Sequence, residues 1–434
     1  MNDFEMELEK LTSFKAIRNV LDGLTLHDLQ CADVLKMLYE KRAMVIYDTG
    51  TGKTLLTAAA MRLLWNEEPS RRFIMFVKKD QLAQTPEKLK NACGRDVIAS
   101  AADAKSLDSL FSCDFISYSV LMLTHECLQS RRMMDALFRV KGLYCGVVVD
   151  EAHELCNLNH ASSASMLSRM VRNFEYCWAL TATPVISDVV QLAKLAVLVD
   201  PERYPNSRRL ELALRRGAFS IKEDSCFFIN RNHEDFGAVC DYRGSIEWVQ
   251  PLPHQKRPMG GAELFQICKG DGAYPQAERL VELILRRKMK SGLIYVQQHE
   301  VRKWILPFFD EAGIRYECIN GYTKFEDRKR IMHEFNVEKS LDVIVTSVTT
   351  ALDLDCDYVI FYEFTLDLKQ MIGRAHRGLS SKTLDIIFII TDETSEVDYF
   401  AGNIMERSLM IRDLLGKNYA EIEDAERSLK ERYA

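Results

Sequence analysis

The stretch Tyr47-Asp48-Thr49-Gly50-Thr51-Gly52-Lys53-Thr54 decides how this chain folds. An apolar run from Ala43 to Tyr47 precedes it and predicts a buried parallel strand. The run from Leu55 to Met61 follows the glycines and predicts a helix. Strand, glycine loop and helix N-terminus together place backbone N–H groups against a polyphosphate. The stretch is therefore predicted to be a P-loop, although Tyr47 stands where the usual pattern begins with glycine.

Side chains in and before this loop supply the groups that hold a nucleotide. Lys53 is predicted to reach the β- and γ-phosphates, and the Thr54 hydroxyl to bind Mg²⁺, so ATP and Mg²⁺ are the expected cofactors. The other predicted cradle residues are Thr49, Gly50, Thr51 and Gly52. Gln30 precedes the loop by about twenty residues. There its carboxamide can recognise an adenine edge, although a solvated surface role fits equally well on chemistry alone.

Composition and charge bound the class of protein. A chain of 434 residues allows about two to four domains with large cores. The net charge of -6 excludes an overall basic field, so any nucleic-acid binding must use local patches. The 12 cysteines form neither a C-x-x-C pair nor a zinc spacing, which predicts reduced thiols. The acidic start and the lack of a long apolar run predict a cytoplasmic protein with no membrane segment.

Apolar strands and helical stretches alternate after the P-loop, which specifies a parallel sheet with covered faces. The predicted strands are Phe73–Val77, Asp114–Tyr118, Tyr144–Val149 and Tyr176–Leu180. In such sheets the loops beyond the carboxyl ends of the strands form the binding edge. Residues there are candidates for contact with a sugar-phosphate backbone, although ordinary loop polarity explains them equally well. These residues are Lys78, Lys79, Ser117 and Tyr118.

Two adjacent carboxylates emerge where one of these strands ends, in Asp150-Glu151-Ala152-His153. In a P-loop enzyme the first carboxylate holds Mg²⁺, and the second orients or deprotonates the attacking water. Asp150 is therefore a predicted metal ligand and Glu151 a predicted catalytic residue. The next strand delivers Thr181-Ala182-Thr183-Pro184, whose hydroxyls are candidates for joining the γ-phosphate site to neighbouring loops. Taken alone, that segment is typical of a turn.

A second α/β pattern follows a stretch of weaker periodicity from about Asp200 to Tyr274. Its predicted strands are Gly292–Val296, Tyr316–Ile319, Val343–Thr346, Tyr358–Tyr362 and Leu384–Ile390, with a further possible strand at Ile246–Val249. It contains no glycine cradle, which suggests a lobe that closes over the nucleotide of the first.

A helix in this second half carries a polar face. Gln370, Arg374 and Arg377 share that face because they are separated by four and three residues. Two guanidiniums so placed can meet a γ-phosphate as charge develops. The alternative on pattern alone is an exposed basic helix.

Together these residues resemble a helicase superfamily 2 motor. Asp150-Glu151-Ala152-His153 resembles its DEAH form of the Walker B motif, Thr181-Ala182-Thr183-Pro184 its coupling motif, and Gln30 its adenine-reading glutamine. The run from Gln370 to Arg377 resembles its Q-x-x-G-R-x-x-R motif, which supplies arginine fingers. The resemblance implies that His153, Thr181 and Thr183 couple hydrolysis to movement.

Within the superfamily the chain looks closest to Swi/Snf-type ATPases and compact phage or viral relatives. The residues that carry this likeness are Gly313-Ile314-Arg315-Tyr316, Asn320-Gly321-Tyr322-Thr323, Phe335-Asn336 and Arg374-Ala375-His376-Arg377. It implies nucleic-acid contacts from Thr323 and Thr346. Two departures from the pattern are the lack of a proline before Lys78 and Thr349-Thr350-Ala351 in place of a glycine pair.

The expected fold class is α/β, with two tandem RecA-like domains, each a mostly parallel sheet flanked by helices, and the ATP site in the cleft between them. The expected divisions are an N-terminal helix at 1–24, lobe 1 at 25–205, a connection at 206–274, lobe 2 at 275–395 and a helical tail at 396–434. In that tail, Glu421 to Arg432 is charged nearly all round.

The expected activity is that of an ATP-dependent nucleic-acid translocase that favours duplex DNA. Two alternatives stay open, a strand-separating DNA or RNA helicase and an ATP-gated loader or scaffold that does not translocate. A replication or recombination protein is an expected partner.

Overall fold

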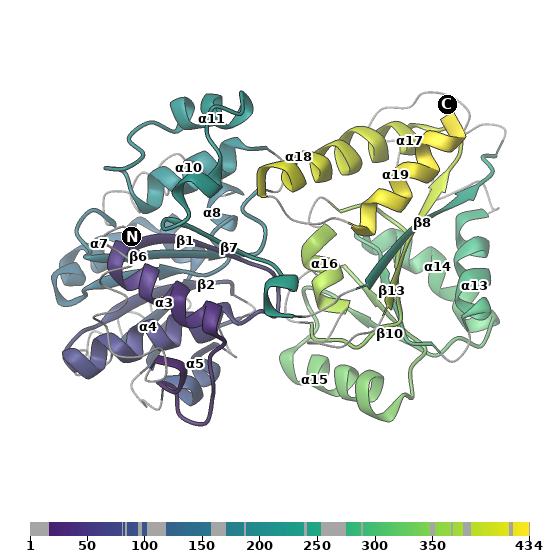
Figure 1. The fold of residues 1–434 in the computed structure, drawn as a ribbon. Helices are drawn as coiled ribbons and strands as arrows, with labels where there is room; N and C mark the ends of the chain where they lie inside the picture. The colour runs from purple at the N-terminus through teal and green to yellow at the C-terminus, as the bar shows by residue number, and fades with distance from the viewer. Residues whose placement is uncertain are drawn as a thin grey trace. The chain divides into compact units, whose positions relative to one another are not determined.

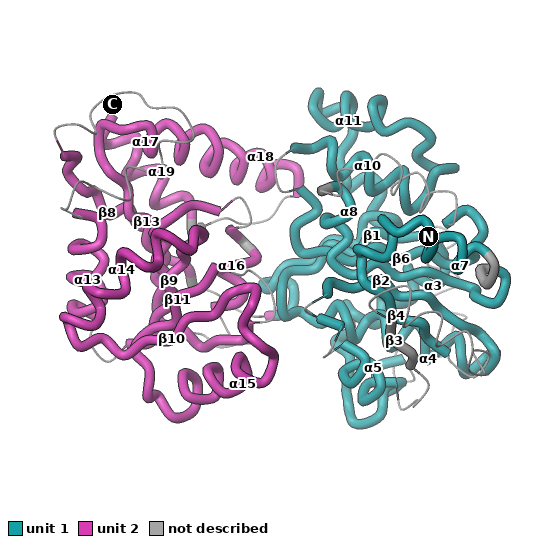
Figure 2. Tube along the Cα trace, turned by 180° about the vertical axis from the view of Figure 1, so that it is seen from behind, with its two compact units in different colours: residues 1–236 teal, residues 237–434 magenta. Residues whose placement is uncertain are grey.

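The computed structural model divides the chain into two compact units, residues 1–236 and residues 237–434 (Figure 2). The residues that it describes are 17–79, 81–82, 85–93, 98–101, 119–157, 171–185, 188–237, 241–252, 275–287, 290–347, 352–365, 368–375, 383–415 and 420–433. In these ranges, no helix combines the length and the apolar character needed to cross a membrane.

The first unit is built on a seven-stranded sheet in the order β3-β4-β2-β5-β6-β1-β7 (Figure 1). Its strands are β1 (Arg42–Tyr47), β2 (Phe73–Val77), β3 (Ile98–Ala101), β4 (Val120–Thr124), β5 (Gly146–Val149), β6 (Tyr176–Thr181) and β7 (Phe228–Arg231). Every neighbouring pair is parallel. The carboxyl ends of all these strands therefore lie at one edge of the sheet.

Helices cover both faces of this sheet because its strands are apolar on both sides. Ala43 and Val45 of β1 belong to a core shared with one group of helices, and Met44 and Ile46, which alternate with them, are also fully buried. That group is α3 (Asp28–Glu40), α4 (Lys53–Glu67) and α5 (Thr85–Cys93). Figure 1 shows α10 (Val190–Val199) and α11 (Ser207–Arg215) on the other side of the sheet. Two further α-helices among the described residues of this unit are α7 (Arg131–Val140) and α8 (Glu154–Asn157).

The second unit contains a six-stranded parallel sheet in the order β10-β11-β9-β12-β13-β8. Its strands are β8 (Asp241–Val249), β9 (Gly292–Tyr295), β10 (Tyr316–Ile319), β11 (Val343–Thr346), β12 (Tyr358–Phe361) and β13 (Thr383–Thr391). Its helices are α13 (Pro275–Arg286), α14 (His299–Glu311), α15 (Phe325–His333), α16 (Leu368–Ala375), α17 (Ser395–Tyr399), α18 (Glu406–Leu415) and α19 (Ala420–Tyr433). The predicted architecture of two tandem RecA-like domains is thus confirmed.

The strands predicted from apolar runs are confirmed wherever the structure describes them. The predicted strand Asp114–Tyr118 and residues 1–16 of the predicted N-terminal helix lie outside the described residues. Three strands were not predicted, β3, β4 and β7. The segment 206–274, expected to connect the lobes, supplies β7 to the first sheet and β8 to the second. The possible strand Ile246–Val249 is the second half of β8, which begins earlier, at Asp241.

The C-terminal helix α19 packs against β8 of the second unit. Ile422 and Ala425 are 1% and 0% exposed, so this highly charged helix has a narrow apolar face. Its last turn is attached to the sheet through Asp392, which accepts hydrogen bonds from Arg432 and Tyr433. The Arg432 guanidinium also lies 4.9 Å from the centre of the Trp248 ring. The helix is therefore an integral part of the second unit.

Replacing Ile422 by Ala should lower the free energy of unfolding by about 2–4 kcal/mol, because it removes buried methylenes and leaves a cavity. Lys430→Ala on the same helix is the matched control. Its exposed ion pair with Glu426 is worth less than about 1 kcal/mol. Urea denaturation followed by circular dichroism measures both variants. Equal effects of the two substitutions would contradict the docking of α19.

Candidate functional site

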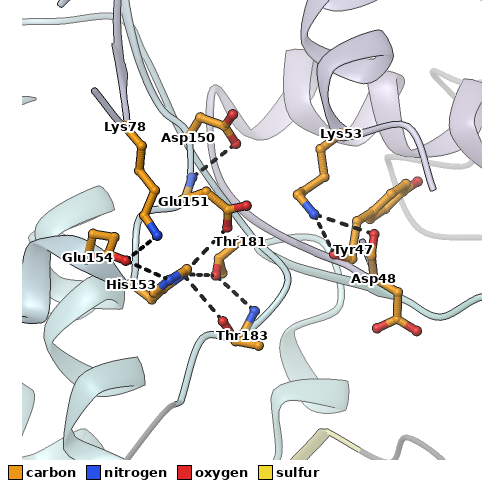
Figure 3. Close-up of polar contacts among 10 residues, drawn as sticks. All are labelled: Tyr47, Asp48, Lys53, Lys78, Asp150, Glu151, His153, Glu154, Thr181 and Thr183. Atoms are coloured by element: carbon orange, nitrogen blue, oxygen red, sulfur yellow. Dashed lines mark hydrogen bonds and ion pairs between the residues drawn. The ribbon is translucent and has the colours of Figure 1, made fainter. Parts of the chain in front are cut away.

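The P-loop lies between β1 and α4. Gly50 and Gly52 have φ angles of 84° and 98°, in the left-handed region that glycine adopts without strain. Gly52 also lacks room for a side chain, since a Cβ there would lie 2.7 Å from Gln30 Nε2. Lys53 Nζ donates to the backbone oxygens of Tyr47 at 3.0 Å and Asp48 at 3.4 Å (Figure 3). Thr54 is half-buried in the first turn of α4.

Tyr47, which replaces the usual glycine, belongs to a buried polar network. It is the last residue of β1 and is fully buried. Its hydroxyl donates to Asp33 Oδ2 at 2.7 Å, and Arg231 donates to both Asp33 oxygens at 2.7 and 2.8 Å. Burial, together with the Asp33 carboxylate, raises the pKa of Tyr47 well above its usual range. The Tyr47 backbone therefore belongs to β1, and the Tyr47 side chain anchors the start of the loop.

Gln30 lies against the P-loop, beside Gly52. Its Nε2 donates to the Thr51 backbone oxygen at 2.9 Å, and its Oε1 accepts from the His27 backbone N–H at 2.9 Å. The second contact forms the capping box of α3 together with the His27 side chain. The structure thus places Gln30 next to the cradle, while recognition of adenine by Gln30 stays a prediction.

The acid pair follows β5, two strands away from β1 in the sheet. Asp150 and Glu151 are 8% and 3% exposed. Glu151 has a φ of 47°, which is unusual for a residue with a side chain. Its N–H donates to Asp150 Oδ1 at 3.0 Å. Such backbone strain costs about 1–3 kcal/mol and is concentrated at active sites. The turn therefore directs two carboxylates to the edge where the P-loop lies.

His153 connects this acid pair to the end of β6. Its ring is fully buried, and Nδ1 lies 2.9 Å from Thr181 Oγ1 and 3.5 Å from Thr183 Oγ1 (Figure 3). The same nitrogen lies 3.7 Å from Glu151 Oε2. Thr183 N–H in turn donates to Thr181 Oγ1 at 3.1 Å. The three predicted coupling residues are therefore brought together around one imidazole.

Lys78, predicted to contact nucleic acid, forms an ion pair with Glu154 at 2.5 Å. Burial alone would raise the pKa of Glu154, but His153 and Lys78 outweigh it and lower that pKa to about 2. Lys79 is exposed beyond the same strand. The other two candidates on this edge, Ser117 and Tyr118, lie outside the described residues.

Several polar residues around the site were missed by sequence reasoning. Arg231 ends a strand that was not predicted, β7, and His233 lies just after it, so no local pattern connected them to the P-loop. Glu154 directly follows the acid motif, which was the one available signal. His125 is buried at the end of β4, and burial lowers its pKa to about 4, which keeps it neutral. Asp33 occupies a buried position on α3.

The polar groups at the carboxyl edge of the first sheet are those that a nucleotide bound with Mg²⁺ requires. Mg²⁺ prefers oxygen ligands and is usually shared with substrate phosphates. Thr54 and Asp150 supply a hydroxyl and a carboxylate, and Lys53 supplies a cation for the phosphates. Two left-handed glycines and the N-terminus of α4 supply backbone N–H groups.

The second unit holds the remaining predicted residues. Gln370 and Arg374 lie on α16, where Gln370 is fully buried and Arg374 is half-buried. Arg377 lies outside the described residues. Thr323 is half-buried, and its hydroxyl accepts from the Asn320 N–H at 2.9 Å. Thr346 is fully buried at the end of β11 and offers no surface to nucleic acid in this structure.

Comparison with known protein families gives two matches. The family described as type III restriction enzyme, res subunit, matches residues 12–186. The family described as helicase conserved C-terminal domain matches residues 275–378. The first match covers the P-loop, the acid pair and the coupling residues, and the second begins at α13 and extends beyond α16.

Individual relatives match over shorter stretches. Helicase SWR1 of Mycosarcoma maydis is 28% identical over 26% of this chain and 7% of that protein. Helicase SWR1 of Eremothecium gossypii is 29% identical over 30% of this chain and 9% of that protein. Chromatin-remodeling ATPase INO80 of Pyricularia oryzae is 27% identical over 35% of this chain and 8% of that protein. The matched stretch therefore spans less than a tenth of each relative's length, and these matches do not support the expected closeness to phage or viral proteins.

Among solved structures, the Sulfolobus solfataricus SWI2/SNF2 ATPase core in complex with dsDNA is 17% identical. The alignment covers 89% of this chain and 92% of that chain, with a TM-score of 0.42.

Glu154→Gln should lower the free energy of unfolding by about 1–2 kcal/mol at pH 7. The Glu154 pKa is lowered from its usual 4.5 to about 2, so its stabilisation is fully present above pH 4.5 and is lost as the pH falls toward 2. Urea denaturation at several pH values between 7 and 3 tests this, with the exposed Glu126→Gln as control. A loss that stays constant across that pH range would contradict the assigned ion pair.

Proposed function

We propose that this superfamily 2 helicase-like chain, built of two RecA-like units, is an ATP-driven motor that moves along nucleic acid, with duplex DNA as its track. One observation carries the proposal. At the carboxyl edge of the first sheet, His153 connects the catalytic acid pair of β5 to the hydroxyls of β6, next to the P-loop of β1. If these residues only stabilised the fold, neither the strained backbone of Glu151 nor the buried contacts of His153 with both loops would be needed.

Each residue of the edge has a role in the proposed hydrolysis. Lys53 leaves the backbone oxygens of Tyr47 and Asp48 and takes up the charge of the β- and γ-phosphates. Thr54 and Asp150 would hold Mg²⁺, which would neutralise phosphate charge when bound. Glu151 orients the attacking water and accepts its proton. Because Glu151 lies close to His153, the imidazole senses the loss of negative charge when Glu151 takes up a proton.

The coupling step is proposed to run through the same histidine. His153 contacts both hydroxyls of the Thr181–Thr183 turn, so a shift of the imidazole changes the hydrogen bonds of the loop after β6. The second unit is proposed to contribute Arg374 and Arg377 as arginine fingers, which act mainly on the transition state. Thr323 and Lys79 are proposed contacts with the sugar-phosphate backbone, which carries no base sequence.

The choice of duplex DNA rests on the relatives rather than on the site. They carry the names helicase and chromatin-remodeling ATPase, and chromatin presents DNA as a duplex. The net charge of -6 means that the track must be gripped by local contacts, which supports a weak, salt-sensitive hold rather than a basic groove.

Lys53→Ala should abolish ATP turnover because it removes the cation that compensates phosphate charge. Glu151→Gln should keep ATP binding but stall hydrolysis, because the amide cannot accept a proton from water. Steady-state phosphate release and nucleotide titration measure the two properties. Glu67→Gln, an exposed residue at the end of α4, is the control. Turnover by Glu151→Gln at the parental rate would show that Glu151 does not have this role.

Duplex DNA should stimulate the ATPase with little sequence preference, and stimulation should fall steeply with added salt as counterion release weakens binding. The test compares the rate with no polymer, duplex DNA, single-stranded DNA and RNA. Displacement of a triplex-forming strand then reports movement along the duplex. Efficient unwinding of a forked duplex without triplex displacement would favour the helicase alternative, and stimulated ATPase with neither activity would favour the loader.

A further inference from the structure

The P-loop of this chain contains an acid, Asp48, two residues before its first glycine, Gly50. The loop has to attract a polyphosphate, and a carboxylate released into it would repel that ligand. A unit charge within about 8 Å of a phosphate, at an effective dielectric constant of about 20 to 40, weakens binding by about tenfold. The position of the Asp48 side chain is therefore important for nucleotide affinity.

The structure shows where this carboxylate is held. Asp48 Oδ2 accepts a hydrogen bond from the His233 backbone N–H at 3.3 Å and lies 3.3 Å from His233 Nδ1. Only 10% of the Asp48 side chain is exposed. Figure 3 shows the carboxyl group pointing away from the Lys53 ammonium, which contacts the backbone oxygen of the same residue. The acid is thus turned out of the phosphate side of the loop.

His233 also holds the next residue of the loop. Its Nε2 lies 2.9 Å from the Thr49 backbone oxygen. Both ring nitrogens therefore face acceptor oxygens, one from a carboxylate and one from a carbonyl. The protonated imidazolium donates to both, whereas a neutral ring donates to only one.

His233 is itself fixed by a turn at the end of β7. The N–H of Asn232 donates to Asp235 Oδ2 at 2.8 Å, and the N–H of Asp235 donates back to Asn232 Oδ1 at 2.9 Å. The Phe236 N–H donates to the His233 backbone oxygen at 3.1 Å, and the Phe236 ring contacts the Tyr47 ring. Upstream of the turn, Arg231 is anchored to Asp33. These contacts fix the backbone on both sides of the imidazole.

We infer that His233 is a positioning residue for nucleotide binding, which holds the Asp48 carboxylate out of the phosphate site and fixes the Thr49 carbonyl. The inference rests on the proposed binding of ATP at the P-loop. It assigns a role in the ATP site to the segment after β7, which directly precedes the second unit in the chain.

His233→Ala should weaken ATP binding about tenfold, because it removes the imidazole that faces the Asp48 carboxylate and leaves only the backbone N–H of residue 233 to hold that group. The double variant Asp48→Asn/His233→Ala should recover to within about threefold of the parent, since the harmful charge is gone. A purely structural loss at position 233 would not be rescued by a neutral residue at position 48. The readout is calorimetric titration with a non-hydrolysable ATP analogue in the absence of nucleic acid.

Three further measurements make the outcome decisive. His233→Gln keeps one donor and should fall between the parent and His233→Ala, and it replaces that variant if His233→Ala unfolds in thermal melts. His333→Ala removes an exposed histidine of α15 and should bind as the parent does. Parental affinity in His233→Ala, or a double variant as weak as the single one, would overturn the inference. Failure of the parent to bind the analogue would instead overturn the proposed function.

Discussion

Parallel pairing of β5, β6 and β1 is the constraint on which the candidate site depends. Val149 lies level with Ala179, and Thr181 lies level with Ile46. With this register, the acid turn, the threonine turn and the P-loop leave the sheet at nearly the same height. A slip of one residue in either pairing would turn the following side chains to the opposite face. Apolar packing on both faces of the sheet prevents such a slip, because every strand position in β1 beyond its first residue is buried. The hydrophobic core and the polar edge are thus two results of the same pairing.

The sequence allowed prediction of those parts of the site that are encoded locally. The glycine loop, the acid pair and the threonine turn each follow an apolar run within a few residues, so both strand and site could be predicted from one short window. Apolar runs that alternate with helical stretches also predicted the second α/β unit. Strand β7 escaped prediction because Phe228-Ile229-Asn230-Arg231 is short and half polar, and only its pairing with β1 makes it a strand. The contact of His233 with Asp48 joins residues 185 positions apart, and no local pattern encodes it. For α19 the apolar face is too narrow to stand out from a charged sequence.

The buried network of Asp33, Arg231 and Tyr47 gives β7 a role beyond extending the sheet. Asp33 is fully buried, and an isolated carboxylate there would be strongly unfavourable. Arg231 compensates it with two hydrogen bonds, so correct placement of β7 is a condition for burying α3 on the sheet. An ion pair of this kind adds little net stability compared with apolar packing, but loss of one partner is costly. It therefore favours one register of β7 over others. The same register carries Asn232 and the residues after it to the base of the P-loop.

The pairing of β8 with β13 has a consequence for how the chain is made. The first strand of the second unit pairs with the last one, from Asp241 with Thr383 to Val249 with Thr391. The strands described in the first unit all precede residue 236 and can pair before any of the second unit has been synthesised. During translation β8 leaves the ribosome early and must wait for its partner until nearly the whole unit has followed. An unpaired strand with free backbone groups is open to wrong pairing during that interval. The speed of elongation through the second half of the message therefore sets how long the nascent chain is exposed to misfolding.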